Sequence, residues 1–236
     1  MQKKLSTILL FSTLIAMPAE ADKIQGLYLG VGIGSQMNRY DLKILDSGQS
    51  YTAKAHKQSV VGELSAGYNW YFHDQWFLGG EAVINFASND ASISLGGDQL
   101  NAIHPITVKI KRDLAYGLAI KVGKTFDKTS VFVRLGAELS EFRVNAHNSS
   151  VTQPNGPNLA RTLSNKKTQF AFVPGIGFEF KANDFLVVGL DVRTSIYKKQ
   201  SLRTQNIIAG QPATDLRVKY KPRVDQAILS FKFPIK

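Results

Sequence analysis

The sequence contains no cysteine, which excludes a disulfide framework and any metal site built on thiolates. Beyond residue 21 it lacks an apolar stretch of about 18 residues, roughly the minimum for a helix that crosses a bilayer. Acidic residues are scarce, because 18 Asp and Glu accompany 29 Lys and Arg and leave a formal net charge of +11. These absences exclude a disulfide-rich scaffold and a helical membrane protein.

The first 21 residues predict a secretory signal peptide. Met1-Gln2-Lys3-Lys4 is a short positive segment, residues 5–17 are mostly apolar, and Ala19-Glu20-Ala21 matches an A-x-A cleavage site. The alternative is an amphipathic first helix of a cytosolic fold. We expect residues 1–21 to be removed on export and residues 22–236 to form one β-rich domain.

Residues 60–72 and 76–86 alternate between an apolar set with residues such as Leu64 and a mixed set that holds carboxylates such as Glu63 and Glu81 together with glycines. Successive side chains of a strand point to opposite sides of a sheet, so the pattern predicts a hairpin with one apolar and one mixed face. A soluble barrel turns its apolar face inward. Here that face is continuous and ends in aromatic residues beside the turn, which is typical of a strand that faces lipid.

The same alternation recurs along the chain and predicts an all-β fold, an eight-stranded antiparallel up-and-down transmembrane β-barrel. The strands are expected at about 25–38, 60–72, 76–86, 106–126, 130–144, 168–181, 185–197 and 222–233. Tight turns are expected at 73–75, 127–129 and 182–184, and long polar loops at 39–57, 88–105, 145–167 and 198–221. Aromatic residues near the tight turns predict a girdle at one membrane interface: Trp70, Phe72, Trp76, Phe126, Phe178, Phe180, Phe231 and Phe233.

This plan resembles the small eight-stranded outer-membrane barrels, the group of the OmpA membrane domain, OmpX and the Opa-like surface antigens. The glycine-alternating segment 26–34 is similar to their first strand, and Phe231 and Phe233 resemble the closing signal that the barrel-assembly machinery recognises. The chain departs from that signal by ending in Pro234-Ile235-Lys236. The resemblance implies a bacterial outer-membrane location, contact with lipid and lipopolysaccharide, and insertion by the assembly machinery. The peptidoglycan-binding domain of full-length OmpA is not expected.

Charged residues on the inward face predict an ion-pair network in the lumen. They are Glu63, Glu81, Asp113, Lys121, Arg134, Glu138, Glu179, Asp191, Arg193 and Lys232. Unpaired buried charges are costly, and eight strands leave room for little more than side chains. The network is expected to be a plug; the alternative is a polar path for small ions.

The four histidines do not predict a catalytic or metal site. His56, His104 and His147 fall in three different expected loops and His73 in a tight turn, without ligand spacing. Lipid A acylases and deacylases are enzymatic barrels of this size, but they place a histidine with a serine and an acid at the outer rim. We expect neither an enzyme nor a metal or other cofactor.

Basic residues in and beside the third and fourth loops predict an anion-binding surface. They are Arg161, Lys166, Lys167, Lys198, Lys199, Arg203, Arg217, Lys219, Lys221 and Arg223. Such a rim attracts lipopolysaccharide phosphates or acidic host glycans and receptors; alternatively it only neutralises lipid phosphates. The expected function is surface display of four loops for envelope integrity and adhesion or ligand contact, the alternative is a low-conductance porin, and nucleic acid is not an expected partner.

Overall fold

The computed structural model describes residues 24–46, 49–73, 75–87, 89–97, 102–148, 161–205 and 215–235. The predicted signal peptide, residues 1–21, lies outside the described residues. No helix in the described ranges is long and apolar enough to cross a membrane. The strands are β1 (Gly26–Asp46), β2 (Gln49–Phe72), β3 (Trp76–Ala87), β4 (Asn89–Gly97), β5 (Ala102–Phe126), β6 (Thr129–Asn148), β7 (Arg161–Asn183), β8 (Leu186–Tyr197), β9 (Gln200–Gln205) and β10 (Asp215–Ile235).

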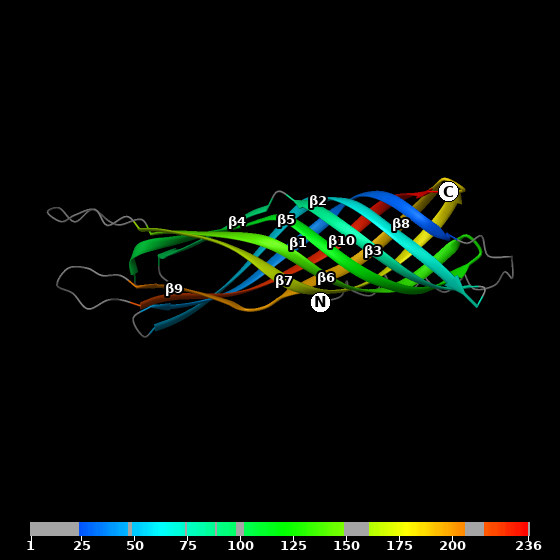
Figure 1. Ribbon diagram of the computed structural model, residues 1–236. Coiled ribbons are helices and arrows are strands. Elements are labelled where there is room, and N and C mark those ends of the chain that lie inside the picture. The colour runs from blue at the N-terminus through cyan, green and yellow to red at the C-terminus, as the bar shows by residue number, and fades with distance from the viewer. Residues whose placement is uncertain are drawn as a thin grey trace, which may run out of the picture.

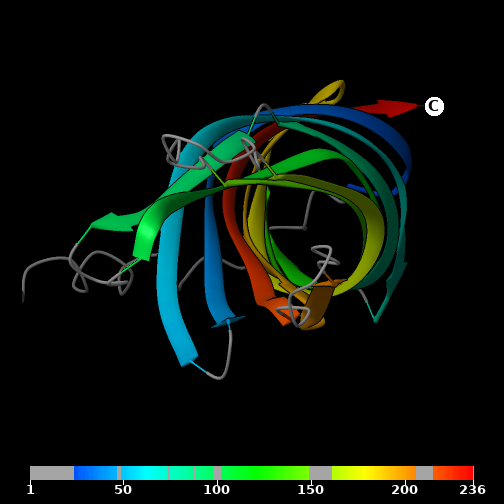
Figure 2. The ribbon, with the colours of Figure 1, turned by 90° about the vertical axis from the view of Figure 1, so that its left-hand side faces the viewer.

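The strands close into a barrel in the order β1-β2-β3-β5-β6-β7-β8-β10, and β10 pairs back with β1. The short strand β4 continues the line of β3 along β5, and β9 continues the line of β8 along β10. All pairings are antiparallel. Figure 1 shows the tilted strands from the side, and Figure 2 shows them curling around a central axis. The predicted eight-stranded antiparallel barrel is confirmed.

Side chains alternate between the outside and the interior of the barrel. Leu118 is 69% exposed and Ile33 is 57% exposed, whereas Lys121 is fully buried. A contiguous apolar surface of this extent is unfavourable in water and suits a lipid environment. The predicted direction of the alternation, with apolar residues outside and charged residues inside, is therefore confirmed for these strands.

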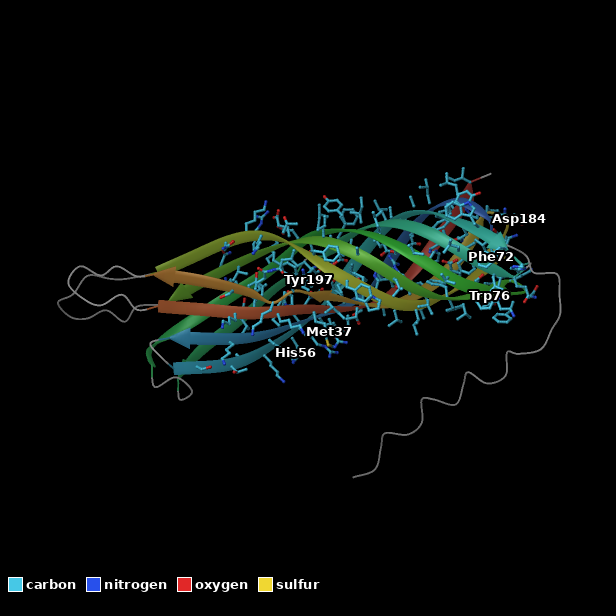
Figure 3. All side chains as sticks on the ribbon, turned by 60° about the horizontal axis from the view of Figure 1, so that its bottom comes forward. Met37, His56, Phe72, Trp76, Asp184 and Tyr197 are labelled. Atoms are coloured by element: carbon cyan, nitrogen blue, oxygen red, sulfur yellow. The ribbon has the colours of Figure 1, made fainter. Side chains whose placement is uncertain are left out.

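Three tight turns lie at one end of the barrel, which we call the short-turn end. They lie between β2 and β3, between β5 and β6, and between β7 and β8. His73 and Asp127 have φ angles of 44° and 52° in these turns, a left-handed conformation for which His and Asp are enriched among non-glycine residues. Figure 3 shows Phe72, Trp76 and Asp184 at this end of the barrel.

Six of the predicted girdle residues lie on strand segments that flank these turns, and Phe231 and Phe233 lie near the C-terminal end of β10. Seven of the eight are between 40% and 54% exposed, and Phe231 is partly buried. Phe185, which the prediction omitted, is 67% exposed in the third turn. The outer surface near the short-turn end is therefore aromatic.

At the opposite end, which we call the long-hairpin end, the prediction of long loops is wrong over most of 39–57, 88–105 and 198–221, and more than half of the predicted loop 145–167 lies outside the described residues. Strands β1 and β2 run through the predicted loop 39–57 and leave only residues 47–48 between them. Strands β4 and β5 cover most of 88–105, and the ends of β6, β7, β9 and β10 enter 145–167 and 198–221. Strands were predicted only where the outward-facing residues are apolar. A strand no longer needs apolar outward residues once it extends beyond the hydrocarbon layer of the membrane.

A β-bulge in β5 changes which residues face the interior. The register with β6 shifts between two pairs, Arg112 with Phe142 and Ala115 with Ser140, so β5 holds one extra residue. Arg112 and Ala115 are both buried, whereas Asp113 and Leu114 lie between them and are partly exposed and exposed. The bulge therefore places two consecutive side chains toward the outside.

Candidate functional site

Seven buried side chains form what we call the short-turn cluster: Tyr28, Glu81, Lys121, Arg134, Glu179, Asp191 and Lys232. Lys121 Nζ lies 3.3 Å from Glu81 Oε2 and 3.1 Å from Glu179 Oε1, and Lys232 Nζ lies 2.8 Å from each of the same two oxygens. The two lysines therefore share the two glutamates across the lumen.

Tyr28 and Arg134 complete this cluster. The Tyr28 hydroxyl donates to Glu81 Oε2 at 2.6 Å and accepts from Lys121 Nζ at 2.8 Å. Arg134 Nη1 lies 3.0 Å from Glu81 Oε1 and 3.1 Å from Asp191 Oδ2. Three bases therefore face three acids, and the formal charge of the cluster is zero.

A closed loop of hydrogen bonds, which we call the mid-barrel ring, crosses the lumen further from the short turns. Its members are Arg193, Gln226, Gln36, Arg112, Glu138 and Asn85, from six different strands. In that order the donor-acceptor distances are 2.8, 3.0, 3.1, 2.6 and 3.5 Å, and Arg193 Nη2 closes the ring on Asn85 Oδ1 at 2.8 Å. Every member is buried.

Glu63 balances the charge of the ring. It pairs with Arg193 Nη2, and Tyr197 donates its hydroxyl hydrogen to Glu138. Two arginines thus face two glutamates, so this layer is also neutral. Ion pairs satisfied in this way avoid the cost of an isolated buried charge, which reaches several kcal/mol.

Asp113 does not belong to the lumen network, contrary to the prediction. The bulge turns it outward, where it lies 2.8 Å from Arg143 Nε on the barrel surface. Arg112, which the sequence analysis omitted, occupies the interior position instead. The signal for it was a change in the inside–outside alternation along β5. Ile110 and Tyr116 are six positions apart and would share a face in a regular strand, yet Ile110 is buried and Tyr116 is 52% exposed.

Apolar and aromatic side chains fill the lumen on both sides of these layers. Phe77 and Phe132 are buried toward the short turns, with ring centroids 6.4 Å apart. Toward the long hairpins, Phe142 and Tyr197 are buried with centroids 4.9 Å apart. A space of about 10 Å³ remains beside Arg134 and the mid-barrel ring, which is near the lower limit for a single water molecule.

The predicted basic residues of the fourth loop lie on the strands and the strand break at the long-hairpin end. Lys198 and Lys199 are exposed between β8 and β9, and Lys221 and Arg223 are exposed on β10. Lys219 is partly exposed. The backbones of Arg161, Arg203 and Arg217 lie in β7, β9 and β10.

Strand pairing adds basic residues of β1 to this group. Arg39 is the register partner of Arg223, and Lys43 is the register partner of Lys219. Asp225 bridges the first pair, with 3.1 Å contacts to both Arg39 Nε and Arg223 Nε. We call the set Arg39, Lys43, Lys198, Lys199, Lys219, Lys221 and Arg223 the basic face. Arg39 and Lys43 were missed because they lie far from the other basic residues in the sequence, and only the pairing of β1 with β10 brings them together.

Lys166 and Lys167 lie on β7. Lys166 Nζ is 2.8 Å from Glu141 Oε2, and Lys167 Nζ donates to Gln200 Oε1 at 2.7 Å. Lys166 therefore points toward β6, whereas Lys167 lies beside the β9 residue that follows Lys199 of the basic face.

A family model described as "Outer membrane protein beta-barrel domain" matches residues 6–220. The chain belongs to this family. It is a protein of the bacterial outer membrane, and the predicted resemblance to small outer-membrane barrels is confirmed. A comparison with curated proteins gave no match.

Solved structures of other outer-membrane proteins are similar to this outer-membrane barrel. OprG of Pseudomonas aeruginosa is 14% identical, with 89% of this chain and 97% of OprG covered and a TM-score of 0.54. Ail of Yersinia pestis is 13% identical (88% and 99% covered, TM-score 0.33), and Neisserial surface protein A is 12% identical (86% and 97% covered, TM-score 0.34). At these identities the likeness concerns the fold.

The histidines of the outer-membrane barrel lie in different places. His56, His104 and His147 were predicted to lie in loops, but they lie within strands β2, β5 and β6. His73 lies in the first short turn, as predicted. Among the described residues, no three His, Asp or Glu side chains converge as ligands of a metal would.

Proposed function

We propose that this outer-membrane barrel displays its basic face outside the cell to an anionic partner, either lipopolysaccharide phosphates or a sulfated or acidic host glycan. The proposal places the long-hairpin end outside, as is usual for barrels with short turns on the periplasmic side. One observation carries it: the cross-strand pairing of like charges, Arg39 with Arg223 and Lys43 with Lys219.

Like charges directly opposite each other in a sheet are destabilising. Asp225 offsets the repulsion between Arg39 and Arg223. For Lys43 and Lys219, among the described residues, we find no carboxylate within ion-pair distance. A bound anion relieves this repulsion, so the face is better suited to an anionic ligand than to remaining empty.

The rival function, a low-conductance porin, is less well supported. The short-turn cluster and the mid-barrel ring each cross the lumen, and aromatic residues fill it beyond both layers. A small ion would have to displace several buried ion pairs to pass. The filled interior instead supports a rigid scaffold for display.

The test is binding of the purified barrel to heparin and to lipopolysaccharide. The variant K198Q/K199Q/K219Q/K221Q removes four charges, and an exposed charge contact contributes about 0.2–1 kcal/mol. We expect its Kd to rise by about tenfold or more for at least one of these two ligands at physiological salt. The matched control K198R/K199R/K219R/K221R keeps the charges and is expected to bind like the wild type.

Heat-modifiable migration on gels shows that each variant retains the folded barrel. Equal affinities of the Gln variant and the wild type for both ligands would contradict the proposal. Equal loss in the Gln and Arg variants would also contradict it, because the effect would then not depend on charge.

A further inference from the structure

A second feature of the outer surface lies over β3, β5, β6 and β7 and, nearer the short-turn end, also over β1 and β2. It begins toward the long hairpins as a groove of about 800 Å³. Charged side chains line this groove, including Lys111, Glu141, Arg143 and Lys166. We call the part that they line the charged rim.

The groove continues toward the short-turn end as an apolar hollow of about 680 Å³. Tyr116 and Leu139 line both parts, so the two are continuous. Small outward residues, Ala66, Ala82 and Ala137, contribute to the lining of the hollow. Larger side chains surround them, with Leu118 69% exposed and Phe170 51% exposed. The surface is thus indented at these alanines, between the bulky residues that surround them.

The bulge in β5 builds the charged rim. It turns Asp113 outward next to Leu114, and Arg143 Nε contacts Asp113 at 2.8 Å and Glu141 at 3.3 Å. A guanidinium has five N–H donors, so a half-exposed Arg143 keeps donors for another partner. Hydrogen bonding from Lys166 lowers the pKa of Glu141, so this carboxylate remains charged.

The charged rim carries a net positive charge. Among the residues that line the groove, Lys111, Arg143 and Lys166 accompany Asp113 and Glu141. Directly below the rim, Phe86, Leu114 and Tyr116 are exposed and apolar or aromatic. The groove therefore changes from cationic to apolar along the barrel axis, in the same order as a phosphorylated lipid changes from headgroup to acyl chain.

We infer that this groove holds a phosphorylated glycolipid of the outer leaflet, with acyl chains in the apolar hollow and phosphate against Arg143, Lys166 and Lys111. The charged rim extends over β5, β6 and β7, which is wide for the single phosphate of a diacyl phospholipid. A second copy of the chain is a poorer occupant. A two-fold contact would bring two net-positive rims together, and the convex wall of a barrel does not fill a hollow.

The experiment uses the folded barrel in nanodiscs that contain lipopolysaccharide and phosphatidylglycerol, with native mass spectrometry to identify retained lipid. A66L/A82L/A137L fills the hollow, and R143Q/K166Q removes rim charge. Matched controls lie outside the groove and outside the basic face: A227L adds bulk on the lipid face of β10, and K54Q/K57Q removes two exposed charges from β2. Heat-modifiable migration confirms folding, and the rim variant remains informative if the triple variant does not fold.

We expect the wild type and both controls to retain lipopolysaccharide and the two groove variants to lose it. Equal retention by all five proteins would overturn the inference. Retention of phosphatidylglycerol in place of lipopolysaccharide, or a dimer that the groove variants abolish, would overturn the assigned occupant. K198Q/K199Q/K219Q/K221Q in the same nanodiscs tests the basic face separately, so failure here is distinguishable from failure of the proposed display function.

Discussion

At the scale of single residues, neighbouring positions in a strand have opposite roles. Arg112 is buried and bonds Gln36, Glu138 and Ser140, whereas Asp113 is turned outward by the bulge. Removing one partner of a buried ion pair leaves an uncompensated charge, while an exposed pair contributes little. The two residues therefore form a matched pair for testing where the lumen boundary lies.

We predict that R112M lowers the free energy of unfolding by about 3–5 kcal/mol, because Glu138 loses its ionic partner in the mid-barrel ring. D113N is expected to change it by less than about 1 kcal/mol. Urea titration in lipid vesicles, followed by tryptophan fluorescence, measures both. A larger effect of D113N than of R112M would restore the original assignment of Asp113 to the lumen.

At the scale of elements, period-two alternation is sufficient to predict the eight strands of the barrel, the three short turns and the inward direction of residues such as Glu81 and Lys121. It fails at two kinds of place. A bulge shifts the phase without an obvious local signal, as at Asp113. Beyond the apolar band the outward residues turn polar, so segments such as 39–46 resemble loops although Tyr40 and Leu42 are buried inside.

The basic face shows the same limit. Its lysines and arginines are visible in the sequence, but the pairing of Lys43 with Lys219 depends on barrel closure between the first and last strands. No local pattern specifies that register. The composition of the candidate site was therefore predictable, and its arrangement was not.

The long hairpins are predicted to be rigid, since their backbone groups are paired in the ladder. In hydrogen exchange on the folded barrel in nanodiscs, amides of residues 39–46 and 49–57 are expected to be protected well beyond those of turn residues 127–128. Paired amides exchange only when a strand opens, which explains the difference. Exchange of both segments at the rate of the turn would show that they are loops after all.

At the scale of the whole molecule, the interior and exterior have different charge balances. The short-turn cluster and the mid-barrel ring with Glu63 contain five acids and five bases, so their formal charge is zero. The positive excess of the chain therefore lies outside these two layers. This distribution separates stability, which depends on paired charges inside, from attraction of anions, which depends on unbalanced charge outside.

The filled, neutral lumen predicts an electrically silent barrel. In planar bilayers we expect no reproducible open steps from the wild type, because an ion must displace paired side chains that are held by several hydrogen bonds each. The variant F77A/F132A removes aromatic filling but keeps both charged layers, and it is expected to stay closed. Adding E81Q/K121Q/E179Q weakens the short-turn cluster and is expected to produce open steps. Steps from the wild type that charge changes at Arg134 or Glu138 abolish would instead establish the porin function, since the charged layers would then line a path for ions.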